Sequence, residues 1–545
     1  MIRTRAARPA TAVGAGGHVD LARSTAAMTL WTLVSRTTGF VRVLVVAAVL
    51  GTTFLGNTYQ SANTVPNLLF ELFAAGLLQA VLIPSLVDIL GRGDKAEAEH
   101  VAGSVLGVVA GGLAVLAGVG MLLAPWIMRA LVAGVASEEV RAAQIRLGTF
   151  LLWFFLPQVV LYAAGMVATG VLNARDRFAL PVFAPVVNNV VVTASYGLFW
   201  LLRDGAEPSL DLTLSQKLVL GGGTTLGVLA FCAVPVLAVA RSGFSLRPRL
   251  DIRHPEVRRL LRRGVWAALY LVSTQVLLAA VLVLANAVEG AVVAYQVAYT
   301  VFLVPHAVLA LPVLTALFPT LARATTSGDG TGYARSLSGG VLAIAYLAAP
   351  ASAALIALAG PLAALTLFGE GARSAATVAG AIAAFAPGLL GYGAFLFLAR
   401  AHYATGDTRT PALVNLGVAA SGVVAMAAAA AVSSPEGRVA ALAGVHSLAY
   451  LAGSGVLLVQ VRRHLPGRAR LALARPLVTT LAAATLSTGA MWLVRAPLDL
   501  PGRAGAAVQV AAAGGVGVGV YLASQAGLGG LRPAGVAAVL RGDGG

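Results

Sequence analysis

Long apolar segments divide this chain, and their number and length constrain the fold more than any other feature. A helix that spans a membrane needs about 20 consecutive, mostly apolar residues. Backbone polar groups inside a bilayer must bond within the chain, so such segments form helices. Fourteen segments qualify, near residues 26–50, 60–90, 101–126, 147–172, 179–202, 217–240, 264–286, 290–322, 336–360, 375–399, 411–433, 439–461, 476–494 and 504–526. The sequence therefore predicts an all-α polytopic membrane protein.

The composition agrees with this fold class and excludes several functions. Charged residues make up 11% of the chain, whereas soluble domains carry about 25%. Cys232 is the only cysteine, so no intrachain disulfide can form. The loops are too short for a soluble catalytic domain, and the chain has no phosphate-binding glycine loop, nucleophile elbow or metal-ligand spacing. We therefore expect no cofactor, no metal and no enzymatic activity.

The arginines predict how the chain is oriented in the membrane. Its net charge is +17, but the basic residues lie in short loops between apolar segments, which indicates membrane topology rather than nucleic-acid binding. If the N-terminus is cytoplasmic, cytoplasmic loops and tails hold 27 Lys and Arg residues, outer loops hold nine, and Arg36 and Arg42 lie in the first segment. Because cytoplasmic loops are enriched in basic residues, this bias predicts that both termini are cytoplasmic.

An internal repeat indicates two related halves. Residues 59–65 of the second segment match residues 295–301 of the eighth at five of seven positions. The spacing of Pro157, Tyr162 and Pro181 is also that of Pro387, Tyr392 and Pro411. Repeats six segments apart predict two pseudo-symmetric six-helix bundles followed by two C-terminal helices, an arrangement typical of transporters.

This repeat leads to a predicted domain organisation. We expect a flexible basic cytoplasmic tail at 1–25, an N-terminal six-helix lobe at 26–241, a basic cytoplasmic linker at 242–263, a C-terminal six-helix lobe at 264–461, a terminal helix pair at 462–526 and a flexible tail at 527–545.

Arg36 and Arg42 are the main candidates for substrate binding. An arginine at membrane depth costs roughly 2.5–3.5 kcal/mol on insertion scales and usually faces a cavity. Six residues separate the pair, so they point about 120° apart and lie roughly 9 Å apart along the helix. They cannot form one clamp but can line one broad cavity, where guanidinium groups suit diphosphate oxygens. The structural alternative is that both bond to backbone carbonyls or reach the interface.

Other polar and proline residues complete the candidate site. Glu71 is the only carboxylate well inside a predicted span; we expect it to pair with Arg36 or Arg42, as a gate or as a structural counter-charge, with proton coupling as a third hypothesis. Further candidates are polar side chains at membrane depth and prolines that could act as hinges. They are Gln60, Asn63, Asn67, Gln296, Pro66 and Pro305.

The first two spans resemble those of the MurJ/MviN lipid II flippases, in the multidrug/oligosaccharidyl-lipid/polysaccharide exporter superfamily. The matching motifs are Ser35-Arg36-x-x-Gly39-x-x-Arg42 and Pro66-Asn67-Leu68-Leu69. The resemblance implies a flippase in the bacterial plasma membrane that moves lipid II, the undecaprenyl-diphosphate-linked peptidoglycan precursor, from the inner to the outer leaflet by alternating access. It adds Ser35 and Gly39 to the substrate site. It also implies contact with membrane lipids, with cell-wall synthesis proteins as further candidate partners.

The chain departs from the family pattern at five positions that usually carry charge, which is similar to flippases of high-GC Gram-positive bacteria. They are Val43, Asn57, Phe70, Ala75 and Thr300. A polysaccharide-unit exporter, a multidrug exporter, a polytopic cell-wall glycosyltransferase and a transport-dead scaffold remain alternatives. Segments 264–286 and 411–433 hold no Asp or Glu, so we expect no sodium site of the kind that some family members build from carboxylates there. Transport driven by the membrane potential is the corresponding hypothesis.

Overall fold

The computed structural model describes residues 15–71, 82–251, 265–465, 472–498 and 500–541. These residues form helices and no strand. The N-terminal lobe contains α1 (Ala15–Val49), α2 (Phe54–Phe70), α3 (Ile83–Gly91), α4 (Lys95–Leu131), α5 (Glu138–Phe155), α6 (Gln158–Asn173), α7 (Ala179–Arg203) and α8 (Leu214–Arg241). The C-terminal lobe contains α10 (Val265–Asn286), α11 (Ala291–Pro305), the π-helical turn η3 (His306–Ala310), α12 (Leu311–Thr326), α13 (Gly330–Ala357), α14 (Ala359–Thr366), the 3₁₀ turn η4 (Gly369–Ser374), α15 (Ala375–Ala404), α16 (Arg409–Val432) and α17 (Arg438–Val461). Helices α18 (Ala474–Arg495), α19 (Gly502–Gly527) and α20 (Pro533–Arg541) follow.

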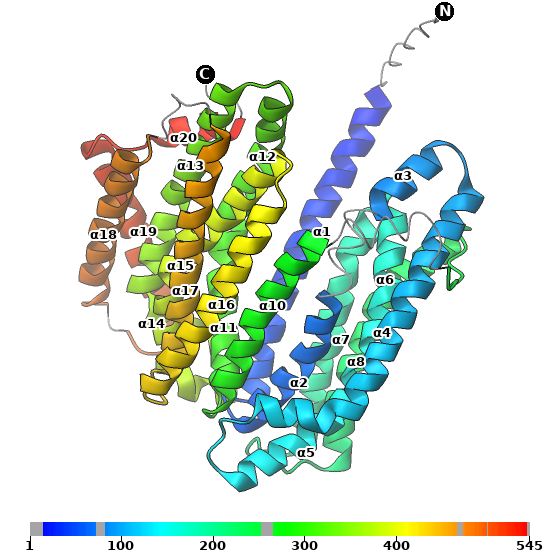
Figure 1. Ribbon diagram of the computed structural model, residues 1–545. Coiled ribbons are helices and arrows are strands. Elements are labelled where there is room, and N and C mark those ends of the chain that lie inside the picture. The colour runs from blue at the N-terminus through cyan, green and yellow to red at the C-terminus, as the bar shows by residue number, and fades with distance from the viewer. Residues whose placement is uncertain (1–14, 72–81, 252–264, 466–471, 499, 542–545) are drawn as a thin grey trace, which may run out of the picture.

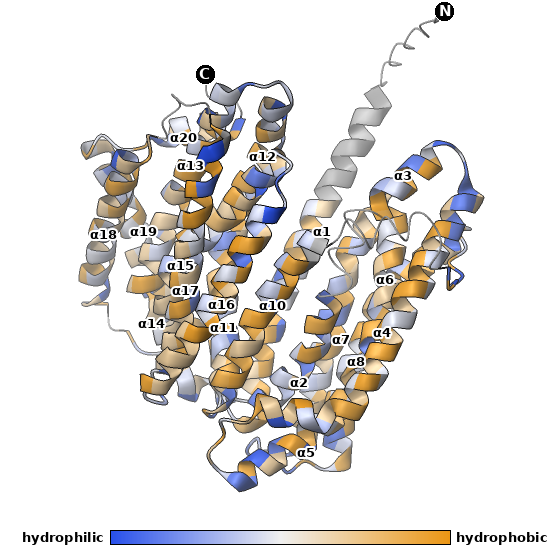
Figure 2. Ribbon diagram, in the orientation of Figure 1, coloured by the Kyte–Doolittle hydropathy of each residue, from blue (hydrophilic) through white to orange (hydrophobic). Residues whose placement is uncertain are grey.

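The helices confirm a polytopic membrane fold. Among the described residues, 13 helical stretches are long and apolar enough to cross a membrane. They correspond to every predicted span except the second, whose region contains α2, α3 and residues 72–81, which lie outside the described residues. Hydrophilic residues gather toward the two ends of the bundles, for example at the α3–α4 turn and around α5, as Figure 2 shows.

The two lobes repeat one packing pattern (Figure 1). In the N-terminal lobe α1 packs on α7, α7 on α8, α8 on α6, α6 on α4, and α5 on α2. In the C-terminal lobe α10 packs on α16, α16 on α17, α17 on α15, α15 on α13, and α15 on α11. A shift of six spans converts the first set into the second, so the repeat predicted from sequence is present in the helix packing. The terminal pair α18–α19 lies outside the repeat, against α13 and α14.

Prolines interrupt some spans and not others. Proline lacks the N–H that a helix interior needs. Pro157 separates α5 from α6, and Pro305 ends α11 before the π-helical turn at His306–Ala310. Pro66 and Pro387, by contrast, lie inside α2 and α15, which continue past them. Helix breaks therefore occur at Pro157 and Pro305 but not at Pro66 and Pro387. A hinge role for Pro66 and Pro305 stays a prediction.

Both predicted tails are partly helical, which corrects their boundaries. Helix α1 begins at Ala15, so residues 15–25 extend the first span, and residues 1–14 lie outside the described residues. Helix α20 lies within the predicted tail 527–545. It packs on α12 and α13, with Val536 buried and Val539 against Gly339. The glycine-rich composition of this tail obscured a short apolar face that needs a packing partner.

Part of the predicted basic linker, residues 242–251, lies along α4 in an extended conformation. The Arg249 amide donates to the Gly103 carbonyl at 2.9 Å, and Lys95 Nζ donates to the Gly243 carbonyl at 2.6 Å. A Cβ at Gly103 would lie 2.3 Å from the Arg247 carbonyl oxygen. The segment can approach α4 only because α4 has a glycine there. Residues 252–264 lie outside the described residues.

Substitution of Gly103 should release this linker segment. In Gly103→Val the new side chain displaces residues 244–251, and overpacking of this kind costs about 1–3 kcal/mol. We expect faster tryptic cleavage after Arg249, which precedes Leu250, in detergent-solubilised protein. Gly112→Val is the matched control, because a Cβ at Gly112 meets no atom within 4 Å. Equal cleavage rates in the two variants would contradict this role of Gly103.

Candidate functional site

The two lobes meet at one end of the molecule and diverge toward the other, where both termini lie (Figure 1). We call the first the closed end. It contains the turns between α1 and α2 and between α10 and α11, together with η4. Among the described residues, every hydrogen bond and ion pair that joins the lobes lies here. Within the described parts of the chain, polar contacts therefore fasten the lobes to each other at the closed end.

Asn57 of α2 makes the most complete contact between the lobes. Its Nδ2 donates to the Val288 carbonyl at 2.8 Å, and its Oδ1 accepts from the Val292 amide at 3.1 Å. One side chain thereby binds both sides of the turn that begins α11. Next to it, Asn286 Nδ2 donates to Ser61 Oγ at 2.8 Å. Asn57, Ser61 and Asn286 are fully buried.

Three glycines allow the lobes to touch through their backbones. A Cβ at Gly290, where φ is +70°, would lie 2.1 Å from the Thr52 carbonyl oxygen. Gly369, with φ of +56°, and Gly371 lie against the carbonyls of Ala48 and Ala47, where a Cβ would come within 2.8 and 2.9 Å. Larger residues would force the lobes apart at these positions.

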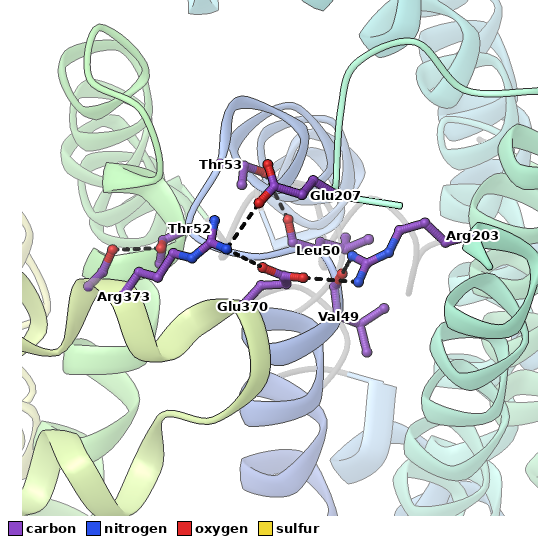
Figure 3. Close-up of polar contacts among 9 residues, drawn as sticks. Val49, Leu50, Thr52, Thr53, Arg203, Glu207, Glu370 and Arg373 are labelled. Carbon is purple, nitrogen blue, oxygen red and sulfur yellow. Dashed lines mark hydrogen bonds and ion pairs between the residues drawn. The ribbon is translucent and has the colours of Figure 1, made fainter. Parts of the chain in front are cut away.

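Ion pairs complete the closed end (Figure 3). Arg203, whose side chain is only 7% exposed, donates through Nη1 to the Val49 carbonyl at 2.9 Å and through Nη2 to Glu370 at 3.1 Å. Arg373 donates to Glu207 at 3.0 Å and lies 3.9 Å from the second oxygen of Glu370. The hydroxyls of Thr52 and Ser374 are 2.6 Å apart.

Arg36 and Arg42 lie on α1 between the closed end and the diverging end. Helix α1 is buried at residues 46–49, Arg42 is half-buried and Arg36 is exposed. Neither guanidinium makes a hydrogen bond or an ion pair within the described part of the chain. Arg36 is near enough to His306 of the C-terminal lobe to interact with it electrostatically. Their six-residue separation prevents a single clamp.

Arg42 lies within electrostatic range of three tyrosines of the N-terminal lobe, Tyr59, Tyr162 and Tyr196. The Tyr59 hydroxyl is 2.9 Å from that of Tyr196. The Tyr162 hydroxyl donates to Asn67 Oδ1 at 3.4 Å, and its ring lies 4.7 Å from that of Phe70, centroid to centroid. This wall can donate and accept hydrogen bonds and stack against a sugar ring.

The remaining predicted site residues divide into two groups. Ser35 and Gly39 face α7: the Ser35 carbonyl accepts from Asn189 Nδ2 at 3.4 Å, and a Cβ at Gly39 would lie 3.4 Å from the same nitrogen. They pack α1 on its neighbour. Gln60 is buried, Asn63 and Gln296 are half-buried and Asn67 is exposed on the helices that line the lobe interface.

Glu71 does not form the predicted ion pair. It is half-buried at the end of α2, and within the described residues no arginine or lysine pairs with it. The tyrosines named above lie within electrostatic range of Arg42, and neither Arg36 nor Arg42 has an ion-pair partner among the described residues.

A cavity of about 210 Å³ lies inside the C-terminal lobe. Four tyrosines, a histidine and two other polar residues contribute to its lining: Tyr295, Tyr299, Tyr392, Tyr450, His446, Thr274 and Gln275. Asn415 of α16 fixes one wall by donating to Thr274 Oγ1 at 3.0 Å and to the Tyr270 carbonyl at 2.8 Å. Neutral hydrogen-bonding groups thus occupy the region where the sequence lacks carboxylates.

The sequence analysis did not predict the contacts of the closed end. It counted Arg203 and Arg373 only among the nine basic residues of the outer loops, and it named Asn57 only as a departure from the family pattern. The signal present was two short loops that each carry both signs of charge, Arg203 with Glu207 and Glu370 with Arg373. Spacing within each loop does not reveal that the pairs form between the loops.

Comparison with known proteins identifies relatives across most of the chain. The profile of a family described as "Lipid II flippase MurJ" matches residues 46–500. The chain is 29% identical to the lipid II flippase MurJ of Burkholderia cenocepacia over 412 residues, 73% of this chain and 76% of that protein. It is 27% identical to the probable lipid II flippase MurJ of Synechocystis sp. over 407 residues, 73% and 74% of the two chains.

Solved structures share the fold. A lipid II flippase MurJ in an inward closed conformation superimposes with a TM-score of 0.69 at 17% identity, over 92% of this chain and 98% of that one. An inward-facing multidrug resistance MATE transporter of the MOP superfamily gives a TM-score of 0.63 at 14% identity, over 79% and 95%. Two lobes followed by a terminal pair are therefore an established architecture.

Removal of the Asn57 side chain should weaken the closed end. Asn57→Ala removes the partner of the buried Val292 amide and one of the two donors to the Val288 carbonyl, which costs roughly 1–3 kcal/mol. Asn57→Asp keeps an acceptor for the amide but loses the donor, so its effect should be intermediate. We expect melting temperatures in detergent in the order wild type, Asn57→Asp, Asn57→Ala. Asn67→Ala, at an exposed position on the same helix, is the control and should melt like wild type.

Proposed function

This chain belongs to the lipid II flippase MurJ family, and we propose that Arg36 and Arg42 bind the diphosphate of lipid II while it crosses the membrane. The chain is accordingly a transporter and not an enzyme. The observation that carries the proposal is the state of these two guanidinium groups: they lie in the first span, away from the closed end at which the described residues of the two lobes bond to each other, and among the described residues no anion pairs with either.

The energetics favour an anionic ligand at this position. An unpaired arginine at membrane depth is costly, and a diphosphate supplies charge-assisted, bidentate hydrogen bonds to a guanidinium. Arg42 lies within electrostatic range of tyrosines of the N-terminal lobe, and Arg36 within that of His306 of the C-terminal lobe. Under this proposal the two arginines contact different parts of one ligand. A diphosphate bridging them would contact both lobes at once.

The other walls suit the uncharged part of the headgroup. Phe70 occupies a position where relatives usually carry arginine, and its ring packs on that of Tyr162. Tyr162 and Asn67 offer a hydroxyl and an amide beside it. Aromatic rings and neutral donors suit sugar rings and peptide groups. We infer that this chain binds the headgroup through fewer charges and more neutral contacts.

In the proposed orientation, the lobes diverge toward the inner leaflet, from which lipid II would enter. The basic bias of the loops supports a cytoplasmic position for both termini. Both termini lie at the diverging end of the lobes (Figure 1). This end would then face the cytoplasm, and the closed end the outside. Lipid II enters from the inner leaflet with its prenyl chain in lipid, and release requires the closed end to open.

Orientation can be tested separately from transport. A C-terminal fusion to green fluorescent protein should fluoresce, and a C-terminal fusion to alkaline phosphatase should be inactive, because both depend on the compartment that receives the C-terminus. The same fusions placed after Pro208, in a loop of the closed end, are the matched control and should behave in the opposite way. Identical behaviour at both sites would contradict the orientation.

Transport should depend on the two arginines. Arg42→Gln and Arg36→Gln each remove a charge-assisted bond to phosphate, which should lower the flipping rate about tenfold or more. The measurement is outer-leaflet accessibility of lipid II in cells depleted of the wild-type protein and complemented with each variant. Arg42→Lys should recover only part of the rate, since lysine lacks the planar fork.

A control variant separates transport from a scaffold role. Arg92 pairs with Asp88 on the exposed α3–α4 turn, so Arg92→Gln should flip lipid II at the wild-type rate. If Arg36→Gln and Arg42→Gln also restored normal accessibility, the arginines would not bind substrate. Normal accessibility after depletion, without another flippase present, would overturn the function itself.

A further inference from the structure

Four charged residues at the closed end can pair in two ways. The N-terminal lobe supplies Arg203 and Glu207, and the C-terminal lobe supplies Glu370 and Arg373. In this structure both short pairs run between lobes, Arg203 with Glu370 at 3.1 Å and Arg373 with Glu207 at 3.0 Å (Figure 3). Each lobe therefore contributes one arginine and one glutamate, and the charges of these two residues cancel.

One alternative pair is already close in space and the other is close in sequence. Arg373 Nη2 lies 3.9 Å from Glu370 Oε2, within the C-terminal lobe. Arg203 and Glu207 flank a tight turn, in which Asp204 and Gly205 have φ of +47° and +78° and the Ala206 amide donates to the Arg203 carbonyl at 3.0 Å. This turn keeps both residues at the same end of α7.

We propose that these four residues form a partner-exchanging latch. With the closed end shut, the pairs run between the lobes; when it opens, Arg203 pairs with Glu207, and Arg373 pairs with Glu370. Neither guanidinium is left unpaired in either state. The latch rests on the proposed alternating-access transport, for which it supplies positioning residues at the end opposite the loading side.

The latch also holds the helix that carries the substrate arginines. Arg203 donates to the Val49 carbonyl as well as to Glu370. Val49 is the last residue of α1 and lies seven residues after Arg42, about 10 Å along the axis. Exchange of the Arg203 partner therefore changes the anchor of α1, and with it the position of Arg42.

The two glutamates contribute unequally to the two states. Arg203 and Glu370 have side chains 7% and 21% exposed, whereas Arg373 and Glu207 are 72% and 75% exposed. Loss of Glu370 leaves Arg203 buried without a carboxylate only when the end is closed. Loss of Glu207 removes an exposed pair from the closed state, which contributes little, but deprives Arg203 of its partner in the open state.

The proposal thus predicts opposite effects for two identical chemical changes. Glu370→Gln should open the closed end, lowering the closed-to-open ratio about tenfold, because removal of one partner of a buried pair leaves an uncompensated charge. Glu207→Gln should raise this ratio by about threefold, since the pair lost from the closed state is exposed and contributes little, whereas the pair lost from the open state involves the less exposed Arg203. A rigid latch without exchange predicts that both substitutions lower it.

A disulfide between the lobes can report the closed fraction. The hydroxyls of Thr52 and Ser374 are 2.6 Å apart across the closed end, so Thr52→Cys with Ser374→Cys should cross-link on oxidation when this end is shut. Cys232 is the only native cysteine and is replaced by alanine. We would measure the initial rate of cross-linking of the full-length protein in membrane vesicles, on the wild-type, Glu370→Gln and Glu207→Gln backgrounds.

Two further variants serve as controls for the cross-linking measurement. Glu138→Gln breaks an ion pair with Arg141 inside the N-terminal lobe and should leave the rate unchanged. Glu370→Asp, with a shorter side chain, should act in the same direction as Glu370→Gln but less, and replaces it if that variant does not accumulate. A slower rate with both glutamines, or an unchanged rate with both, would overturn the latch. Cross-linking requires no lipid II, so failure of the latch and failure of the proposed function are separable.

Discussion

The carbonyl groups at the end of α1 are the point on which the two lobes close. A helix leaves its last carbonyls without partners inside the helix. Here Arg203 donates to that of Val49, while Gly369 and Gly371 of the C-terminal lobe lie directly against those of Ala48 and Ala47. Because the contact is made by backbone, it tolerates no side chain on the facing residues. The first span is thus pinned at one end by both lobes, which places Arg42 and Arg36 at successive depths along it.

Arg203 differs from Arg36 and Arg42 in its burial and in its bonding partners. Arg203 is buried and bonded to a carbonyl and a carboxylate, as expected for a charge that serves structure. Arg36 and Arg42 lie on the pinned helix without such partners in the described part of the chain. One arginine bonded at the closed end and two without a partner among the described residues fit the proposed division between a closure role and a binding role. Under that proposal the substrate anion pairs with Arg36 and Arg42.

The sequence predicted the helices far better than the contacts between lobes. Hydropathy located spans such as 264–286 and 411–433 to within two residues of α10 and α16, because the need to span a bilayer fixes helix length. The repeat predicted the order of neighbouring helices in each lobe. Ser35 and Gly39, however, belong to a motif that mixes packing and binding positions, and only the position of α7 distinguishes them. The predicted C-terminal tail was wrong for a related reason: the apolar face of α20 is only a few residues long and gives little signal in the sequence.

Departures from the family pattern acquire a physical meaning at two positions. Asn57, at one of the positions where the family pattern usually carries charge, both donates and accepts between the lobes, whereas a carboxylate could only accept. Phe70, at another of these positions, packs on Tyr162 beside Asn67. Both changes replace charge by neutral contacts within one chain. Fewer fixed charges in the cavity reduce the desolvation that each conformational change requires. The remaining charges, on α1 and in the latch, then bear more of the coupling between ligand binding and closure.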